Sequence, residues 1–264
     1  MSLAASLGLF LAAGLLGGLL LGLIGVGMAL IAVPLLAMTL PSFGIGPTAA
    51  PLTALATSMS IVSVGSISSI ISHHRLGNVD WSVVRTTVPA SVIGVAAGSL
   101  VATHLPGDSL RWVFCTFLII IAAKMLLPAK SPAHRAIETG VWRYRIVGAI
   151  IGVAGSLIGA GGGVFMVPFL GSRGHSMVRA VATSTAIGLP VSVFGAAVYS
   201  VQTSPVQTDT MLGYVFLPAF FGLSLGSIIA APYGARLATR IPTAMLRRAF
   251  AILLLVLAVK LMIE

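Results

Sequence analysis

The chain has 264 residues, of which 58% are apolar and 8% are charged, and its formal net charge is +10. A soluble globular domain carries about 25% charged residues, so this composition excludes a soluble fold, and the lipid bilayer is the solvent that fits it. The positive charge fits Lys and Arg in cytoplasmic loops, and no basic soluble segment is long enough to bind a nucleic acid.

Long uncharged runs predict membrane-spanning helices. Residues 1–74, 146–172, 180–208 and 210–235 contain no Asp, Glu, Lys or Arg. Roughly 20 apolar residues span the hydrocarbon core as a helix, and these runs lack the alternation of membrane barrel strands. In chain order, we predict eight hydrophobic segments: 3–40, 48–72, 83–104, 110–128, 142–171, 178–200, 211–234 and 245–263.

The first and fifth segments are long, and glycines break each of them near its middle. Residues 23–36 read LIGVGMALIAVPLL and align without a gap with residues 157–170, which read LIGAGGGVFMVPFL. The tripeptide Ala-Thr-Ser occurs at 56–58 and again at 182–184, and the last helices of the two halves also align. The sequence therefore predicts a duplicated unit, and transporters built from repeats place their substrate sites where the halves meet.

The distribution of positive charge indicates how the halves are oriented. If the fifth segment turns back inside the membrane at Gly159–Gly163, thirteen Lys and Arg lie on one side and only Arg111 and Lys260 on the other, as the positive-inside rule requires. Equivalent loops then fall on opposite sides, which predicts inverted repeats with both chain ends in the periplasm.

The predicted fold is thus an all-α polytopic membrane protein with two inverted-topology repeats. Each repeat is a glycine-broken helical hairpin followed by three transmembrane helices. The predicted boundaries are 1–128 for the first repeat, 129–141 for a cytoplasmic linker and 142–264 for the second repeat.

The broken hairpins are the predicted substrate site. An interrupted helix leaves backbone groups unpaired, which lipid tolerates only where they are buried in protein or line a polar cavity. A half-helix N-terminus carries partial positive charge and free donors, and so suits an anion. The candidate binding residues are Gly25, Gly27, Gly159, Gly161, Gly162 and Gly163, with the hydroxyls of Thr57, Ser58, Thr183 and Ser184 around them.

Structural roles for the same residue types stay open. Small-residue motifs often serve close helix packing, which is the preferred interpretation for Gly18–Gly22. The hydroxyls could equally form helix-to-helix or local backbone hydrogen bonds.

Acidic residues are absent from the middle of every predicted span. Asp80, Asp108, Glu138, Asp209 and Glu264 all fall in loops or at the chain end. Cation and proton pathways usually employ intramembrane acids, so a metal or organic-cation transporter is disfavoured, and neither a metal nor another cofactor is expected. A coupling ion, either a proton or sodium, stays possible.

The five histidines also fall near predicted loops, where we expect them to be interfacial and solvated. His73, His74 and Arg75 are weaker candidates for a gate or a substrate entrance.

The duplicated glycine stretches, the Ala-Thr-Ser steps and the loop Arg75-Leu-Gly-Asn-Val-Asp80 resemble the TauE/SafE family of sulfite exporters over nearly the whole chain. The first hairpin departs from the family's glycine-rich pattern, since Met28 and Ala29 stand where Gly162 and Gly163 stand in the second. The resemblance implies export of sulfite or an organosulfonate across the bacterial inner membrane. It does not specify the anion or the oligomeric state.

Three functions are weighed. The first is a secondary transporter that exports a small sulfur-containing anion by alternating access, and it is not an enzyme. The second is an anion channel or a non-transporting membrane subunit. The third and least favoured is an intramembrane hydrolase, because a serine enzyme needs a histidine close to the serine at membrane depth.

Overall fold

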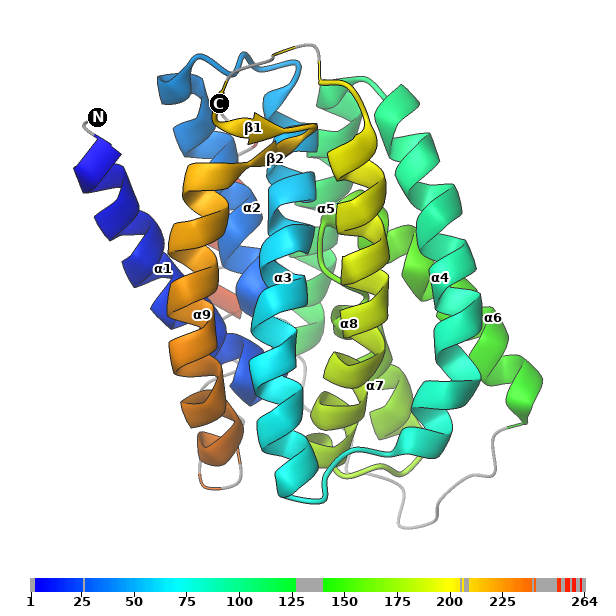
Figure 1. Ribbon diagram of the computed structural model, residues 1–264. Coiled ribbons are helices and arrows are strands. Elements are labelled where there is room, and N and C mark those ends of the chain that lie inside the picture. The colour runs from blue at the N-terminus through cyan, green and yellow to red at the C-terminus, as the bar shows by residue number, and fades with distance from the viewer. Residues whose placement is uncertain are drawn as a thin grey trace.

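The computed structural model describes residues 3–25, 27–126, 140–204, 206, 209–238 and 240, and the short stretches 251–252, 255–256, 258–259 and 262. Most of the predicted linker 129–141 and of the predicted last segment 245–263 therefore lies outside the described residues. The helices, shown in Figure 1, are α1 (Leu3–Ile24), α2 (Gly27–Thr39), the 3-10 turn η1 (Leu40–Phe43), α3 (Ala50–Arg75), α4 (Trp81–His104), α5 (Gly107–Leu126), α6 (Val141–Ile158), α7 (Gly163–Ser172), α8 (Met177–Val201) and α9 (Leu217–Leu237).

The chain is a multi-pass helical membrane protein, as predicted from its composition. Six of the described helices are long and apolar enough to cross a bilayer: Ser6–Ile24, Ala50–Arg75, Trp81–His104, Val141–Ile158, Met177–Val201 and Leu217–Leu237. Large apolar side chains such as Leu16, Ile93 and Phe221 are exposed on the outside of this bundle, which is the surface that lipid covers.

The start of the last described span corrects one prediction. The sequence predicts one apolar span over 211–234, but its first residues form two short antiparallel strands, β1 (Met211–Leu212) and β2 (Val215–Phe216). The helix begins only at Leu217, with Pro218 in its first turn, a position where the missing N–H of proline costs no hydrogen bond. Hydropathy cannot separate this apolar hairpin from the apolar helix that follows it.

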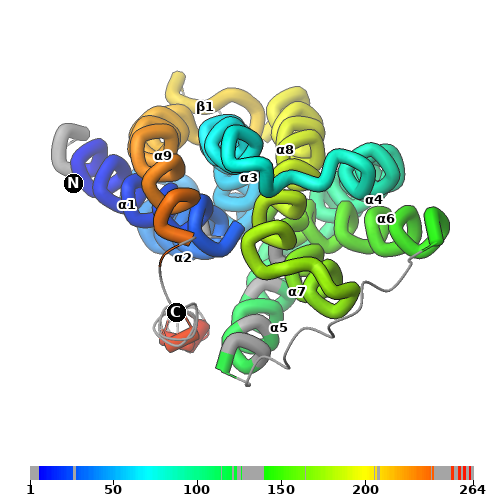
Figure 2. The backbone as a smooth tube through the Cα atoms, turned by 90° about the horizontal axis from the view of Figure 1, so that it is seen from below, coloured from blue at the N-terminus to red at the C-terminus, as the bar shows by residue number. Residues whose placement is uncertain are grey.

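Helices from the two halves of the chain pack against each other. Viewed along the bundle, α1, α2 and α9 form one group and α4 and α6 another, with α3 and α8 between them (Figure 2). The approach is close, because an added Cβ at Gly22 of α1 would overlap the carbonyl of Ala231 in α9, and one at Gly152 of α6 would overlap that of Ser91 in α4. Glycine at such contacts lets helix backbones come together.

Basic residues gather at one end of the bundle. The α3–α4 connection, the α7–α8 connection, the start of α6 and the end of α9 all lie at the lower end in Figure 1. They carry Arg75, Arg143, Arg173 and Arg236, among others. Arg111 lies near the start of α5, which follows the α4–α5 connection at the upper end in Figure 1. The structure thus separates these side chains by end, and which end faces the cytoplasm stays a prediction.

Candidate functional site

A small cavity lies where the two broken hairpins meet α3 and α8. Its lining residues are Leu21, Gly25, Val62, Ser66, Ala160, Gly161, Gly163, Ser184, Thr185 and Gly188. The volume open to the centre of a water molecule is about 10 Å³, which holds roughly one water. In this conformation the cavity is therefore too small for an oxyanion such as sulfite.

Left-handed backbone at glycine produces both breaks. Gly25 ends α1 with a φ of 81°, and α2 begins two residues later, at Gly27. The second break is longer, since Gly159, Gly161 and Gly162 have φ values of 72°, 56° and 80° before α7 begins. No side chain caps the N-terminus of α7, and its first residue, Gly163, lines the cavity, so the positive end of the helix dipole lies beside the cavity.

Each hairpin tip packs against the Thr-Ser helix of the other half. A Cβ added at Gly25 would lie 3.1 Å from Val181 Cγ1 in α8, and one added at Gly159 would lie 3.1 Å from Leu55 Cα in α3. Val181 follows Leu55 by 126 positions, the same spacing that relates the two Ala-Thr-Ser steps. The tips also touch, because a Cβ at Gly163 would lie 2.6 Å from the Gly25 carbonyl oxygen.

The two serines of the Thr-Ser pairs donate to the second hairpin. Ser58 Oγ donates to the Gly159 carbonyl and Ser184 Oγ to the Gly163 carbonyl, each at 2.8 Å. Both serines are fully buried, and only Ser184 lines the cavity. In this conformation the serine hydroxyls hold the tip in place, and their predicted role as anion donors stays a prediction.

The two threonines accept hydrogen bonds from the opposite half. The Phe216 backbone N–H donates to Thr57 Oγ1 at 2.9 Å, and the Asp80 N–H donates to Thr183 Oγ1 at 3.0 Å. Phe216 and Asp80 are the residues that precede α9 and α4. Neither threonine lines the cavity; each fastens the start of a span from the other half.

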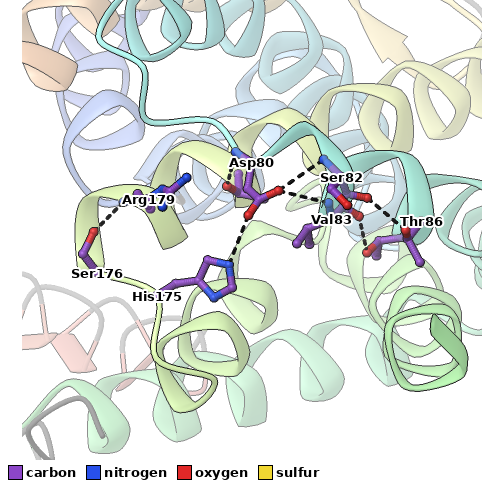
Figure 3. A network of polar contacts seen from close by, with 9 residues as sticks. Asp80, Ser82, Val83, Thr86, His175, Ser176 and Arg179 are labelled. Atoms are coloured by element: carbon purple, nitrogen blue, oxygen red, sulfur yellow. Dashed lines mark hydrogen bonds and ion pairs between the residues drawn. The ribbon is translucent and has the colours of Figure 1, made fainter. Parts of the chain in front are cut away.

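Asp80 is the centre of a polar network at the basic end of the bundle (Figure 3). Its Oδ1 caps α4 by accepting from the N–H groups of Ser82 and Val83 at 3.2 and 3.3 Å. Its Oδ2 lies 3.5 Å from Nε2 of His175, in the loop that precedes α8. The carboxylate therefore joins the loops of the two halves at this end.

The predicted gate residues lie in the last turn of α3, away from the cavity. His74 and Arg75 are exposed, and His74 Nδ1 accepts from Trp81 Nε1 at 3.2 Å. His73 corrects the expectation that every histidine is solvated: it is fully buried, and its Nε2 lies 3.0 Å from the Gly22 carbonyl oxygen. The last turns of α1 cover it, which its place near a predicted loop could not reveal.

Sequence reasoning missed several cavity residues, notably Ser66, Thr185 and Gly188. Ser66 precedes Ser192 by the 126 positions of the repeat, so the duplication carried a signal for it, whereas Thr185 could be found only from its place directly after the predicted pair. Within the described part of the chain, no three His, Cys, Asp or Glu side chains gather as metal ligands.

A second and wider cavity lies nearer the Arg111 end, between α2, α3 and α5. It is open to water centres over about 160 Å³, and its lining residues include Pro41, Pro47, Ala54, Leu55 and Arg111. Leu55 also packs against Gly159, so the wider cavity reaches a residue that touches the second hairpin tip.

The family profile described as "Sulfite exporter TauE/SafE" matches residues 10–261. The chain belongs to the TauE/SafE family. A probable membrane transporter protein of Haemophilus influenzae is 31% identical over 97% of this chain and 98% of its own length. Similar proteins with the same description occur in Methanocaldococcus jannaschii, at 26% identity over 90% of this chain and 89% of the relative, and in Bacillus subtilis, at 25% identity over 88% and 90%. No solved structure matches this TauE/SafE chain.

Proposed function

We propose that this TauE/SafE transporter exports a small sulfur-containing anion, sulfite or an organosulfonate, across the bacterial inner membrane by alternating access. The observation that carries the proposal is the cavity between two touching glycine tips, each produced by left-handed backbone and each packed on the other half. The proposed orientation places the basic end in the cytoplasm and both termini in the periplasm.

The chemistry of the lining favours an anion. Among the described residues no charged side chain lines the central cavity, so a cation would find no counter-charge from them. The hydroxyls of Ser184 and Thr185 already donate to backbone carbonyls. The donors left for a ligand are the hydroxyl of Ser66 and the backbone N–H groups at the start of α7, where the helix dipole adds positive potential.

The closed state of the cavity supports a carrier over a channel. At one end the Phe216 N–H is bonded to Thr57, and at the other the Asp80 N–H is bonded to Thr183. Both contacts join the two halves, so opening either end requires one half to move against the other, as alternating access does. The wider cavity beside Arg111 offers an anion its approach from that end.

Gly161→Val tests the proposal in proteoliposomes loaded with sulfite. Gly161 has a φ of 56°, and its Cβ would lie 3.1 Å from Val62 Cγ1 and 3.2 Å from the Gly188 carbonyl, so a branched side chain fills the cavity. Misplacing groups by about 1 Å can cost roughly 100-fold in rate, and we expect a loss of sulfite efflux of at least about that size.

Gly171→Val is the matched control, because it lies in α7 with no atom within 4 Å of an added Cβ, and its efflux should equal that of the wild type. Normal efflux from Gly161→Val would remove the hairpin from the mechanism. Efflux that grows linearly with voltage and does not saturate would assign a channel instead. Thermal shifts with sulfite, sulfate, thiosulfate, taurine, isethionate and sulfoacetate would identify the anion, since a ligand of the folded state stabilises it.

A further inference from the structure

One face of α3 carries three polar side chains between the central cavity and the basic end of the bundle. Ser66 lines the cavity, Ser69 follows three positions later and His73 four positions after that. Residues three and four apart lie on the same face of a helix, and seven residues span roughly 10 Å along its axis. All three side chains are at most 1% exposed.

Two polar atoms on this face lack a partner. Ser69 Oγ and His73 Nδ1 are buried and form no hydrogen bond with any described residue, although buried polar groups are nearly always paired. His73 Nε2 must carry its hydrogen, because the Gly22 carbonyl 3.0 Å away can only accept. The neutral imidazole then presents Nδ1 as an open acceptor, which is where it can take up a proton.

In the first half, the hydrogen bond from His73 to the Gly22 carbonyl anchors the last turn of α1. The second half forms the equivalent hydrogen bond without a histidine. Tyr199 stands 126 positions after His73, and Ser156 stands 134 positions after Gly22. Tyr199 is fully buried, and its hydroxyl donates to the Ser156 carbonyl at 3.1 Å. Each half therefore anchors the last turn of its first hairpin helix with a side chain near the end of its Thr-Ser helix. Only the first half uses an imidazole, which can be either neutral or protonated.

We call Ser66, Ser69 and His73 the polar path, and only the first half has all three of these side chains. Ser66 has a counterpart in Ser192, but the position that matches Ser69 is Gly195. The second half thus lacks both the middle hydroxyl and the titratable end of the path.

We propose that His73 is the proton-binding site that couples anion transport to a pH gradient, and that Ser66 and Ser69 connect it to the central cavity. The inference rests on the proposed function. Nδ1 takes up one proton to give an imidazolium, with both nitrogens donating, and returns that proton when the neutral ring re-forms. The hydrogen bond to Gly22 ties this charge change to α1, three residues before the break at Gly25.

Other charged or titratable groups sit on the elements around α3. On α3 itself His74 and Arg75 are exposed, and α9 contributes Tyr233 and Arg236, which are also exposed, whereas α1 and α2 contribute none. The remaining groups, on helices that contact other parts of α3 and on the adjoining loop, are Asp80, Asp108, Arg111, Cys115, Arg143, Tyr144, Arg145, Arg179 and Tyr199. Within the described residues no carboxylate forms an ion pair with His73, so the imidazole is the group on this path that can change charge.

The test compares wild type with His73→Gln and His73→Tyr in sulfite-loaded proteoliposomes that contain a pH-sensitive dye. Both variants keep a donor for Gly22, and neither titrates near neutral pH. We expect sulfite exchange at equal pH to stay within about twofold of wild type. We expect acceleration by a pH gradient, and the internal pH change that accompanies efflux, to fall at least tenfold. Ser69→Ala, which leaves His73 in place, should slow the pH change several-fold.

His104→Gln is the matched control, since His104 is an exposed histidine at the far end of α4, and it should behave as wild type. Retained pH coupling in both His73 variants would overturn the inference and leave His73 an anchor like Tyr199. If neither variant folds, as judged by gel filtration and thermal unfolding, Ser69→Ala decides alone: unchanged proton movement overturns the inference. Wild-type protein that moves sulfite without pH dependence refutes only this inference, whereas wild type that moves no anion refutes the proposed function.

Discussion

The two halves of the molecule use the same backbone contacts with different chemistry. Thr57 and Thr183 each accept an N–H from the residue that precedes a span of the other half, yet that residue is Phe216 in one case and Asp80 in the other. The tips differ in length as well, with two residues between α1 and α2 and four between α6 and α7. The contacts that both halves share hold the helices in place. The differences in residue type and tip length show which functional groups occur in only one half.

The helix pairs that join the halves should tolerate substitution least. At Gly22 and Gly152 an added side chain meets the backbone carbonyl of a neighbouring helix, so the helices must separate. We expect Gly22→Val and Gly152→Val each to lower the free energy of unfolding by about 3 kcal/mol, measured by thermal or denaturant unfolding in detergent. Gly46→Val, which has open space, is the control, and an equal loss there would contradict the packing argument.

The two tips should differ under alanine substitution. Left-handed backbone costs a residue with a Cβ roughly 1–2 kcal/mol, and this applies to Gly25 and Gly159 alike. At Gly159 the nearest atom is the backbone Cα of Leu55, whereas at Gly25 it is the Val181 side chain, which can turn. Gly159→Ala should therefore lower the unfolding free energy by about 2 kcal/mol, more than Gly25→Ala does. A larger loss of unfolding free energy for Gly25→Ala than for Gly159→Ala would show that the shorter tip, at Gly25, is the less able to adjust.

The threonine contacts should also be unequal. Thr57→Val leaves the buried N–H of Phe216 without an acceptor, and an unsatisfied buried donor costs roughly 1–3 kcal/mol. Thr183→Val leaves the N–H of Asp80 unpaired in a partly buried site, where water can replace the acceptor. We expect a loss of unfolding free energy of roughly 1.5 kcal/mol for Thr57→Val and less for Thr183→Val. Equal losses would mean that water is excluded equally from the N–H of Phe216 and from the N–H of Asp80.

The smallest effect should come from the contact between Asp80 and His175, which has no counterpart beside Phe216 among the described residues. Both side chains are partly exposed, and exposed ion pairs contribute about 0.2–1 kcal/mol. His175→Gln should lower the unfolding free energy by roughly 0.5 kcal/mol in low salt and by less in high salt. A loss that does not depend on salt would show that packing, not charge, holds the two loops together.

The duplication made the hairpin breaks predictable from sequence. Gly25 and Gly159 align in LIG stretches that are too glycine-rich for helix interior, and the structure breaks both helices there. The class of fold followed from composition alone. The repeat boundaries and the inversion rest on sequence and charge, and they stay predictions.

Three other features of the structure could not be predicted from the sequence. Spans that are apolar on all sides do not show which face is inside, so Ser66 and Gly188 could not be placed at the cavity. The hairpin at 211–216 is as apolar as the helix after it. His73 lies near a loop in sequence, but its burial depends on α1, which no local pattern connects to it.

The pairing of α1 with α9 also constrains how the protein is made. Gly22 in the first helix finds its partner Ala231 only in the last described span, so most of the chain must leave the ribosome before that contact exists. Until then the face of α1 that carries Gly14, Gly18 and Gly22, which packs on α9 in the folded protein, has no partner helix. A truncated product lacking α9 would leave Gly22 without this partner helix.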